Sequence, residues 1–195
     1  MSLARPRPPF RADHVGSLLR PQRLRAARAA HAAGRLGAGA LRAIEDEEII
    51  AAIAKQEAIG LRAATDGEFR RAYWHFDFLA GLDGVEMYEP EQKVAFKGAT
   101  LPHALRVTDR ITWRRPVMIE DFRFTAEHVG RAVAKQTIPS PSVLHFRGGR
   151  QAIDRAVYPE LDGFFAHCSA SVRRLPSSVE AKPHCGESAS CSSGR

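Results

Sequence analysis

The sequence predicts an α/β protein in which short strands and longer helices alternate along the chain. Short apolar runs alternate with longer segments of helical periodicity. Polar clusters follow these runs where the predicted strands end, in HVGS, TDGE and TIPSPS. Apolar residues make up 44% of the 195-residue chain. That share is sufficient for one packed domain.

The first third of the chain is predicted to form a strand and two helices. The strand covers residues 10–15. A helix follows from Pro21, which suits a first turn, to Gly34. A second helix is expected to begin near Ile44, because the acids of EDEE favour the positive end of the helix dipole. Gly60 ends this second helix.

In the middle of the chain, the apolar pattern changes from helical spacing to short alternating runs. A short strand is predicted in LRAATDGE. The run RAYWHFDFLAGL is predicted to be helical, because Tyr73, Phe76 and Leu79 fall at helical spacing. From Val85 to Trp113, short alternating runs are separated by proline and glycine. This pattern predicts an antiparallel insertion.

The last third is predicted to contain a helix in EDFRFTAEHV and a strand in RAVAKQTIPSPS that runs into a loop. AIDRAVYPELDGFFA is predicted to be helical on either side of Pro159. Periodicity and bulky apolar residues then become scarce. The expected organisation is a domain over residues 1–166 and a disordered tail over residues 167–195.

Charge and cysteine content restrict the classes of protein to which the chain can belong. The net charge of +7 favours acidic partners, and a small nucleic-acid-binding protein with an arginine-rich first helix is one alternative. The acidic EDEE and TDGE segments argue against a continuous basic face, so nucleic acid is not the expected partner. Neither a leader nor a membrane span is visible, which predicts a cytoplasmic protein without a membrane partner. The odd count of three cysteines argues against a disulfide framework.

Two acids at the end of a predicted strand are candidate functional groups. Glu68 follows Gly67, and Asp66 lies two residues earlier. A carboxylate at this position can receive a substrate ammonium or hold a catalytic proton. The alternative is a structural ion pair with Arg70 or Arg71.

A second candidate is the short run HVGS. Gly16 leaves the backbone open, so that amides around Ser17 can cradle a carboxylate. His14 could equally be an ordinary histidine at the rim. Trp74 and His75 are predicted to pack or to shape a ligand pocket, with packing the commoner role of such residues.

Three long segments resemble the cobalamin-independent methionine synthase family. They are RADHVGSLLRP, EDEEIIAAIAKQEAIGLRAATDGEFRRAYWHFDF, and KQTIPSPSVLHFRGG through VYPELDGFFA. The resemblance covers residues 8–166 and is greatest to the single-barrel members, which correspond to the C-terminal catalytic domain of the long enzyme. It implies a (β/α)8 TIM barrel, of which about the first half is present.

The resemblance also implies a reaction. The family transfers a methyl group from 5-methyltetrahydrofolate, usually polyglutamated, to homocysteine, with zinc lowering the pKa of the thiol. Val15, Gly16 and Ser17 match the segment that holds the homocysteine carboxylate, and Glu68 matches the acid that receives the amino group. The loop from Ser140 to Phe146 matches a region near the folate. The wider set of residues expected at a substrate or folate pocket is His14, Asp66, Trp74, His75, Ser140 and Phe146.

The resemblance ends before the zinc ligands of the family, which are expected downstream of residue 195. The expected product is therefore an incomplete or inactive methyltransferase. A half barrel leaves strand edges and inner faces uncovered, which predicts an unstable chain unless a partner covers them. A non-catalytic fragment that pairs with a complementary half is the remaining alternative.

Overall fold

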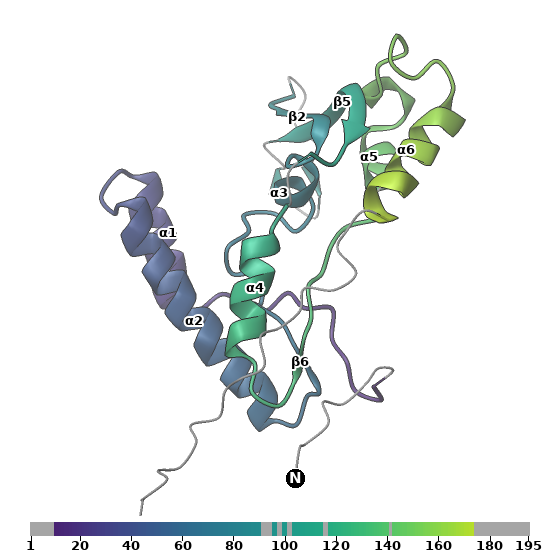
Figure 1. Cartoon of the computed structure of the whole chain (residues 1–195). Helices are drawn as coiled ribbons and strands as arrows, with labels where there is room; N and C mark the ends of the chain where they lie inside the picture. The colour runs from purple at the N-terminus through teal and green to yellow at the C-terminus, as the bar shows by residue number, and fades with distance from the viewer. Residues whose placement is uncertain are drawn as a thin grey trace, which may run out of the picture.

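Helices and short strands build two neighbouring apolar cores (Figure 1). The computed structural model describes residues 10–90, 95–96, 99–100, 103–114, 117–140 and 142–173. In chain order the elements are α1 (Gln22–Ala32), α2 (Ala38–Ala58), β1 (Ala63–Ala64), α3 (Phe76–Leu79), β2 (Asp83–Tyr88), β3 (Ala95–Phe96), β4 (Ala99–Thr100), β5 (Ala104–Thr112), α4 (Ile119–His128), β6 (Val133–Ala134), α5 (Val143–Gly148), the 3₁₀ helix η1 (Arg150–Ala152) and α6 (Leu161–Arg173). The predicted mixture of α and β structure is confirmed.

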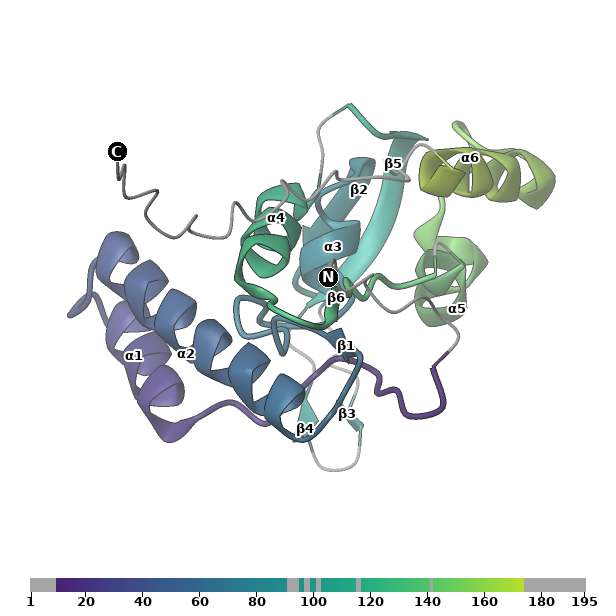
Figure 2. The ribbon, with the colours of Figure 1, turned by 60° about the horizontal axis from the view of Figure 1, so that its bottom comes forward.

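The first core lies where α1, α2 and α4 meet the parallel strand pair. Helices α1 and α2 lie side by side in both views of the ribbon (Figures 1 and 2). Leu24, Ile49 and Ile53 are buried between them and the strands, together with Val129 after α4. These apolar residues follow helical spacing along α2, so one stripe of that helix faces the core.

The strands of the first core run parallel. Ala63 of β1 pairs with Val133 of β6, and Ala64 pairs with Ala134. The chain returns from β1 to β6 through α3, the β2–β5 sheet and α4, because parallel strands need a long crossover connection. This crossover brings the polar segments after β1 and β6 to the same edge.

The second core is built on the antiparallel strands β2 and β5, which confirms the predicted antiparallel insertion. Val85 pairs with Val107, and the helices α3, α5 and α6 contact β5. Leu79 and Phe164 are fully buried there. Figure 2 shows α5 and α6 on the opposite side of the molecule from α1 and α2.

Four local predictions are wrong. The segment before Pro159 is not helical, because Ile153 pairs with Val107 of β5 and the Asp154 carboxylate accepts the Ala156 N–H at 2.8 Å; only the segment after Pro159 forms a helix, α6. Residues 10–15 form no strand, because side chains bind this segment: Lys135 Nζ donates to the Asp13 carboxylate at 2.7 Å and to the His14 carbonyl at 2.5 Å. Helix α2 begins at Ala38, six residues before Ile44, with Gly37 as its extended N-cap. The residues before Phe76 are not helical.

The short extent of α3 has a clear cause. The Asp77 carboxylate accepts the backbone N–H groups of Ala72 at 3.1 Å and Tyr73 at 2.7 Å. An aspartate that binds nearby amides stabilises a turn in competition with a helix. At the other end of the chain, α6 continues to Arg173, beyond the predicted boundary at 166, and residues 174–195 lie outside the described part of the structure.

Two arginines of the first helix pair with acids of α2. Arg23 pairs with Glu47 at 2.5 Å, and Arg28 pairs with Glu45 at 2.9 Å. Arg28 Nη1 also donates to the Arg71 carbonyl at 3.2 Å. Arg28 is part-buried, whereas the Arg23–Glu47 pair lies at the surface. Because both arginines are paired with acids, these contacts argue against a continuous basic face for nucleic acid on this helix.

Candidate functional site

The turn after β1 holds a buried glutamate in an unusual backbone conformation. Glu68 is 4% exposed and has a φ of 58°, in the left-handed region that L-residues seldom adopt. The Asp66 carboxylate accepts the Glu68 N–H at 2.9 Å, and Thr65 Oγ1 accepts the Gly67 N–H at 3.2 Å. The side chains of the strand end therefore shape this turn.

The N-terminal loop docks against the same turn. Thr65 Oγ1 donates to the Gly16 carbonyl at 2.8 Å, and the Leu18 N–H donates to the Gly67 carbonyl at 3.1 Å. Gly16 is buried with a φ of 118°, and a Cβ there would lie 2.8 Å from Thr137 Cγ2. Two segments that the sequence marks as candidate sites, around Gly16 and around Glu68, are thus in direct contact.

The Glu68 carboxylate is itself held by two side chains. Thr137 Oγ1 donates to Glu68 Oε1 at 2.8 Å, and Arg71 Nη1 lies 3.4 Å from the same oxygen. Arg71 Nη2 donates to the Thr137 carbonyl at 2.7 Å. The structural ion pair considered for Glu68 therefore forms, with Arg71.

Arginine side chains also hold the backbone of the turn. Arg20 Nη2 donates to the carbonyls of Glu68 at 3.1 Å and Arg71 at 2.5 Å. Arg28 donates to the Phe69 carbonyl and to that of Arg71. Buried carbonyl groups at a helix-free turn need such donors.

Asp66 and Arg70 have structural partners. Burial raises the pKa of the Asp66 carboxyl above its ordinary value, while the Glu68 N–H and the nearby Arg71 act in the opposite direction. Arg70 does not pair with Glu68; its guanidinium contacts Asp46 and lies 3.5 Å from Asp121 Oδ1, between α2 and α4.

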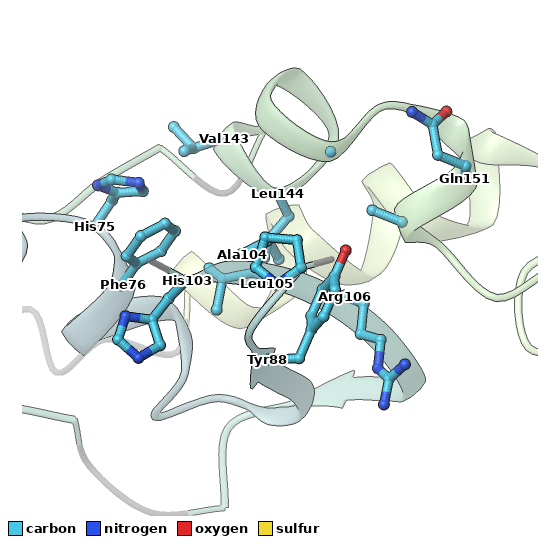
Figure 3. Close-up of a pocket in the computed structure, with 13 residues that line it drawn as sticks. His75, Phe76, Tyr88, His103, Ala104, Leu105, Arg106, Val143, Leu144 and Gln151 are labelled. Carbon is cyan, nitrogen blue, oxygen red and sulfur yellow. The ribbon is translucent and has the colours of Figure 1, made fainter. Parts of the chain in front are cut away.

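A cavity of about 590 Å³ is lined by residues of α3, β2, β5 and α5 and by His75, which follows the Glu68 turn in the sequence (Figure 3). Two histidines and an arginine bring polar tips to it, His75, His103 and Arg106. Phe76 and Leu144 supply apolar lining. The Arg106 guanidinium binds Glu86 through two 3.0 Å hydrogen bonds. His75 is 3% exposed, and its ring lies 4.6 Å from the Trp74 ring.

The other predicted site residues lie nearer the surface. Val15 is 81% exposed, Trp74 44% and Phe146 81%, and none of the three lines the cavity. Ser17 and Ser140 are exposed, and Ser140 Oγ lies 2.8 Å from Ser142 Oγ. His14 is half-buried, and its ring nitrogens have no hydrogen-bond partner among the described residues.

Two contributors to the site escaped sequence reasoning. Thr137 belongs to the polar run TIPSPS, but nothing in that run distinguishes the residue that contacts Glu68. Arg20 is one of many arginines in a segment whose composition is biased toward arginine and alanine. Their roles depend on contacts between segments 48 to 69 residues apart.

The described residues do not offer a zinc site. In that part of the chain, no group of three His, Cys, Asp or Glu side chains is arranged to hold a metal ion. Glu68 Oε1 contacts Thr137 and Arg71, and Asp66 Oδ1 accepts a backbone N–H. No step of the chemistry is therefore assigned here to a metal held by these residues. None of the helices in the described ranges has the length and apolar character needed to cross a bilayer.

Comparison with known proteins shows which proteins the chain resembles. No model of a protein family matches the sequence. The protein YxjG of Bacillus subtilis, whose function is uncharacterised, is 51% identical over 148 residues, which cover 75% of this chain and 39% of YxjG. A methionine synthase of Sulfurisphaera tokodaii is 28% identical over 130 residues, which cover 67% of this chain and 38% of that enzyme.

A solved structure shares the fold. A candidate vitamin-B12-independent methionine synthase from Listeria monocytogenes superimposes with a TM-score of 0.70 at 41% identity, over 84% of this chain and 46% of the other. The chain thus spans under half the length of these relatives. Over most of its length, the chain is thus similar in sequence and fold to vitamin-B12-independent methionine synthase-like proteins.

Proposed function

We propose that the chain carries the acceptor-binding part of a methyltransferase that methylates the thiol of homocysteine. Its relatedness to methionine synthase-like proteins supports a function of this general kind. The observation that carries the proposal is the contact between the Gly16 loop and the Glu68 turn, fixed by the Thr65–Gly16 hydrogen bond.

The roles within this site follow from charge. An amino acid presents an ammonium and a carboxylate on the same carbon, so its receptor needs an anion and N–H donors close together. Glu68 supplies the anion, and the backbone around Gly16 and Ser17 supplies the N–H donors. Val15 flanks these amides. Arg71 and Thr137 hold Glu68 Oε1.

The cavity lined by His75 is proposed to receive the methyl donor, 5-methyltetrahydrofolate. Its apolar lining suits the aromatic rings of the donor, and the imidazoles of His75 and His103 suit its acidic tail. Phe146 and Ser140 lie on or before α5, whose residues Val143 and Leu144 line the cavity. The Trp74 ring contacts the His75 ring, with the two centroids 4.6 Å apart.

We also propose that the chain forms the first part of a barrel. The parallel pair β1–β6, with its long crossover through α4, is consistent with the first strands of a (β/α)8 barrel. Zinc, which the family resemblance implies, is assigned no ligand among the described residues. A second polypeptide could supply the other half of the barrel, because the proposed acceptor site uses only residues of this chain.

The test is calorimetric titration of the 195-residue chain with L-homocysteine under reducing conditions. Binding by the wild type is expected, with at least about 10-fold weaker binding after Glu68→Gln, because the ammonium loses its ionic partner. Glu127→Gln, at an exposed position of α4, is the matched control and should bind as the wild type does. Equal binding by the Glu68→Gln variant would refute the proposed acceptor site.

A further inference from the structure

We infer that Thr137 is a positioning residue that aims the Glu68 carboxylate at the ammonium of the acceptor. This inference rests on the proposed function, in which Glu68 receives that group. Thr137 lies three residues after β6, and Glu68 lies four residues after β1. The parallel pairing of these strands brings the two residues together.

Three atoms of Thr137 contact three different parts of the site. Its hydroxyl donates to Glu68 Oε1 at 2.8 Å. Its carbonyl accepts from Arg71 Nη2 at 2.7 Å, while Arg71 Nη1 lies 3.4 Å from Glu68 Oε1. Its methyl group lies 2.8 Å from the position that a Cβ on Gly16 would take.

The hydroxyl fixes one carboxylate oxygen and so orients the other. The contacts to Glu68 that come from described side chains go to Oε1. Because Glu68 is buried and its backbone is locked by Asp66, rotation about its side-chain bonds is the remaining freedom. The Thr137 hydrogen bond removes that freedom before the ligand arrives, which lowers the entropic cost of binding.

The methyl group has a separate consequence. It fills the space beside Gly16, so the loop that carries the proposed carboxylate-binding amides packs on the same residue that holds the ammonium-binding acid. Thr137 therefore sets the spacing between the two halves of the amino-acid site. Valine keeps a methyl at this place without the hydroxyl, and serine keeps the hydroxyl without the methyl.

The test measures discrimination rather than affinity alone. L-homocysteine and 4-sulfanylbutanoate, which lacks only the amino group, are titrated into the 195-residue chain and its variants. The wild type is expected to prefer L-homocysteine by about 10-fold or more. Thr137→Val should lose about 10-fold for L-homocysteine and little for the desamino analogue. Thr137→Ser should recover the preference, although both ligands bind more weakly if the Gly16 loop shifts.

The outcomes separate the two ideas. If the wild type shows no preference for L-homocysteine, the proposed role of Glu68 fails, and the inference about Thr137 fails with it. If the wild type discriminates and Thr137→Val discriminates equally, only the inference is overturned. An equal loss for both ligands in a folded Thr137→Val variant would mean a merely structural role. If Thr137→Val does not fold, Thr137→Ser decides, because loss of its preference would contradict a role for the hydroxyl.

Discussion

Gly16 occupies a place where both the backbone and the neighbouring side chains exclude a larger residue. Its φ of 118° lies in a region that L-residues rarely adopt, and an added Cβ would lie 2.8 Å from Thr137 Cγ2 and 3.2 Å from Thr65 Cγ2. Gly16→Ala is expected to destabilise the protein by about 1–3 kcal/mol, through strain and the displaced threonines. Urea unfolding measures this change.

The matched control for that substitution is Gly39→Ala in α2. Nothing lies within 4 Å of a Cβ at Gly39, and alanine favours a helix over glycine. The control should leave the free energy of unfolding unchanged or raise it by up to about 1 kcal/mol. A Gly16→Ala variant as stable as its control would show that the Gly16 loop does not pack on Thr137.

Asp66 gives the stability of the protein a defined pH dependence. Burial raises the pKa of its carboxyl in the folded state above 3.8, so the folded protein holds this proton more tightly than the unfolded chain. The resulting stabilisation is present below pH 3.8 and is lost as the pH rises through the folded pKa. Asp66→Asn stays neutral and keeps an oxygen to accept the Glu68 N–H. Its stability relative to the wild type should therefore increase as the pH rises from 4 toward 7, measured by urea unfolding at each pH.

Asp13 provides a control of opposite sign. The hydrogen bond from Lys135 lowers the pKa of its carboxyl, so its stabilising contribution is present above pH 3.8 and is lost as the pH falls. Asp13→Asn should lose stability relative to the wild type as the pH rises toward about 4, and the difference should stay nearly constant from there to pH 7. If both variants shift in the same direction, the assigned cause of the Asp66 effect is wrong.

At the scale of elements, the sequence predicts those whose determinants are local. Helix α1 ends close to Gly34, and α4 and the antiparallel pair β2–β5 form where their periodicity indicates. The errors have both distant and local causes. Lys135 binds the segment around Asp13, which therefore forms no strand. The early start of α2 reflects Ala38 and Leu41, whose helix propensity outweighs that of Gly39.

In the candidate site, the sequence predicts individual residues but not the contacts between them. Glu68 and Gly16 stand out in the sequence because each follows a predicted strand. Glu68 comes directly after a glycine, and Gly16 is itself a glycine. Their contact, and the partners Thr137 and Arg20, depend on how β6 and the N-terminal loop approach β1. No local pattern encodes that approach, since it arises from packing of the whole crossover.

One carboxylate links α2 to the turn between α4 and β6. Glu57 Oε1 accepts three consecutive backbone N–H groups, from Gly130 at 2.9 Å, Arg131 at 2.8 Å and Ala132 at 2.8 Å. Glu57→Ala should destabilise the protein by about 2 kcal/mol, because these amides lose a charged acceptor. Thermal unfolding measures the loss. Glu127→Ala at an exposed position should change stability by less than about 0.5 kcal/mol; a similar change in both would exclude a special role for Glu57.

At the scale of the whole molecule, two cores are joined through the turn that holds the candidate site. The first core contains α1, α2 and the parallel pair, and the second contains β2, β5 and α6. The Glu68 turn belongs to the first core, and His75 of the cavity precedes α3 of the second. Function as proposed therefore requires both cores to be folded together, because acceptor and donor sites lie on different sides of this junction.

The packing of α6 tests whether the second core is folded in solution. Cys168 on α6 is 3% exposed, and burial raises the pKa of its thiol to about 12. Thiolate is the reactive form, so labelling in the folded protein at pH 8 should be at least about 100-fold slower than in the urea-unfolded chain.

The measurement uses a Cys185→Ser, Cys191→Ser variant, since those cysteines lie outside the described residues. A folded α6 also predicts that labelling follows the same urea transition as loss of helix. Rapid labelling in the absence of urea would show that α6 does not pack on β5, and the second core would then need a partner to form.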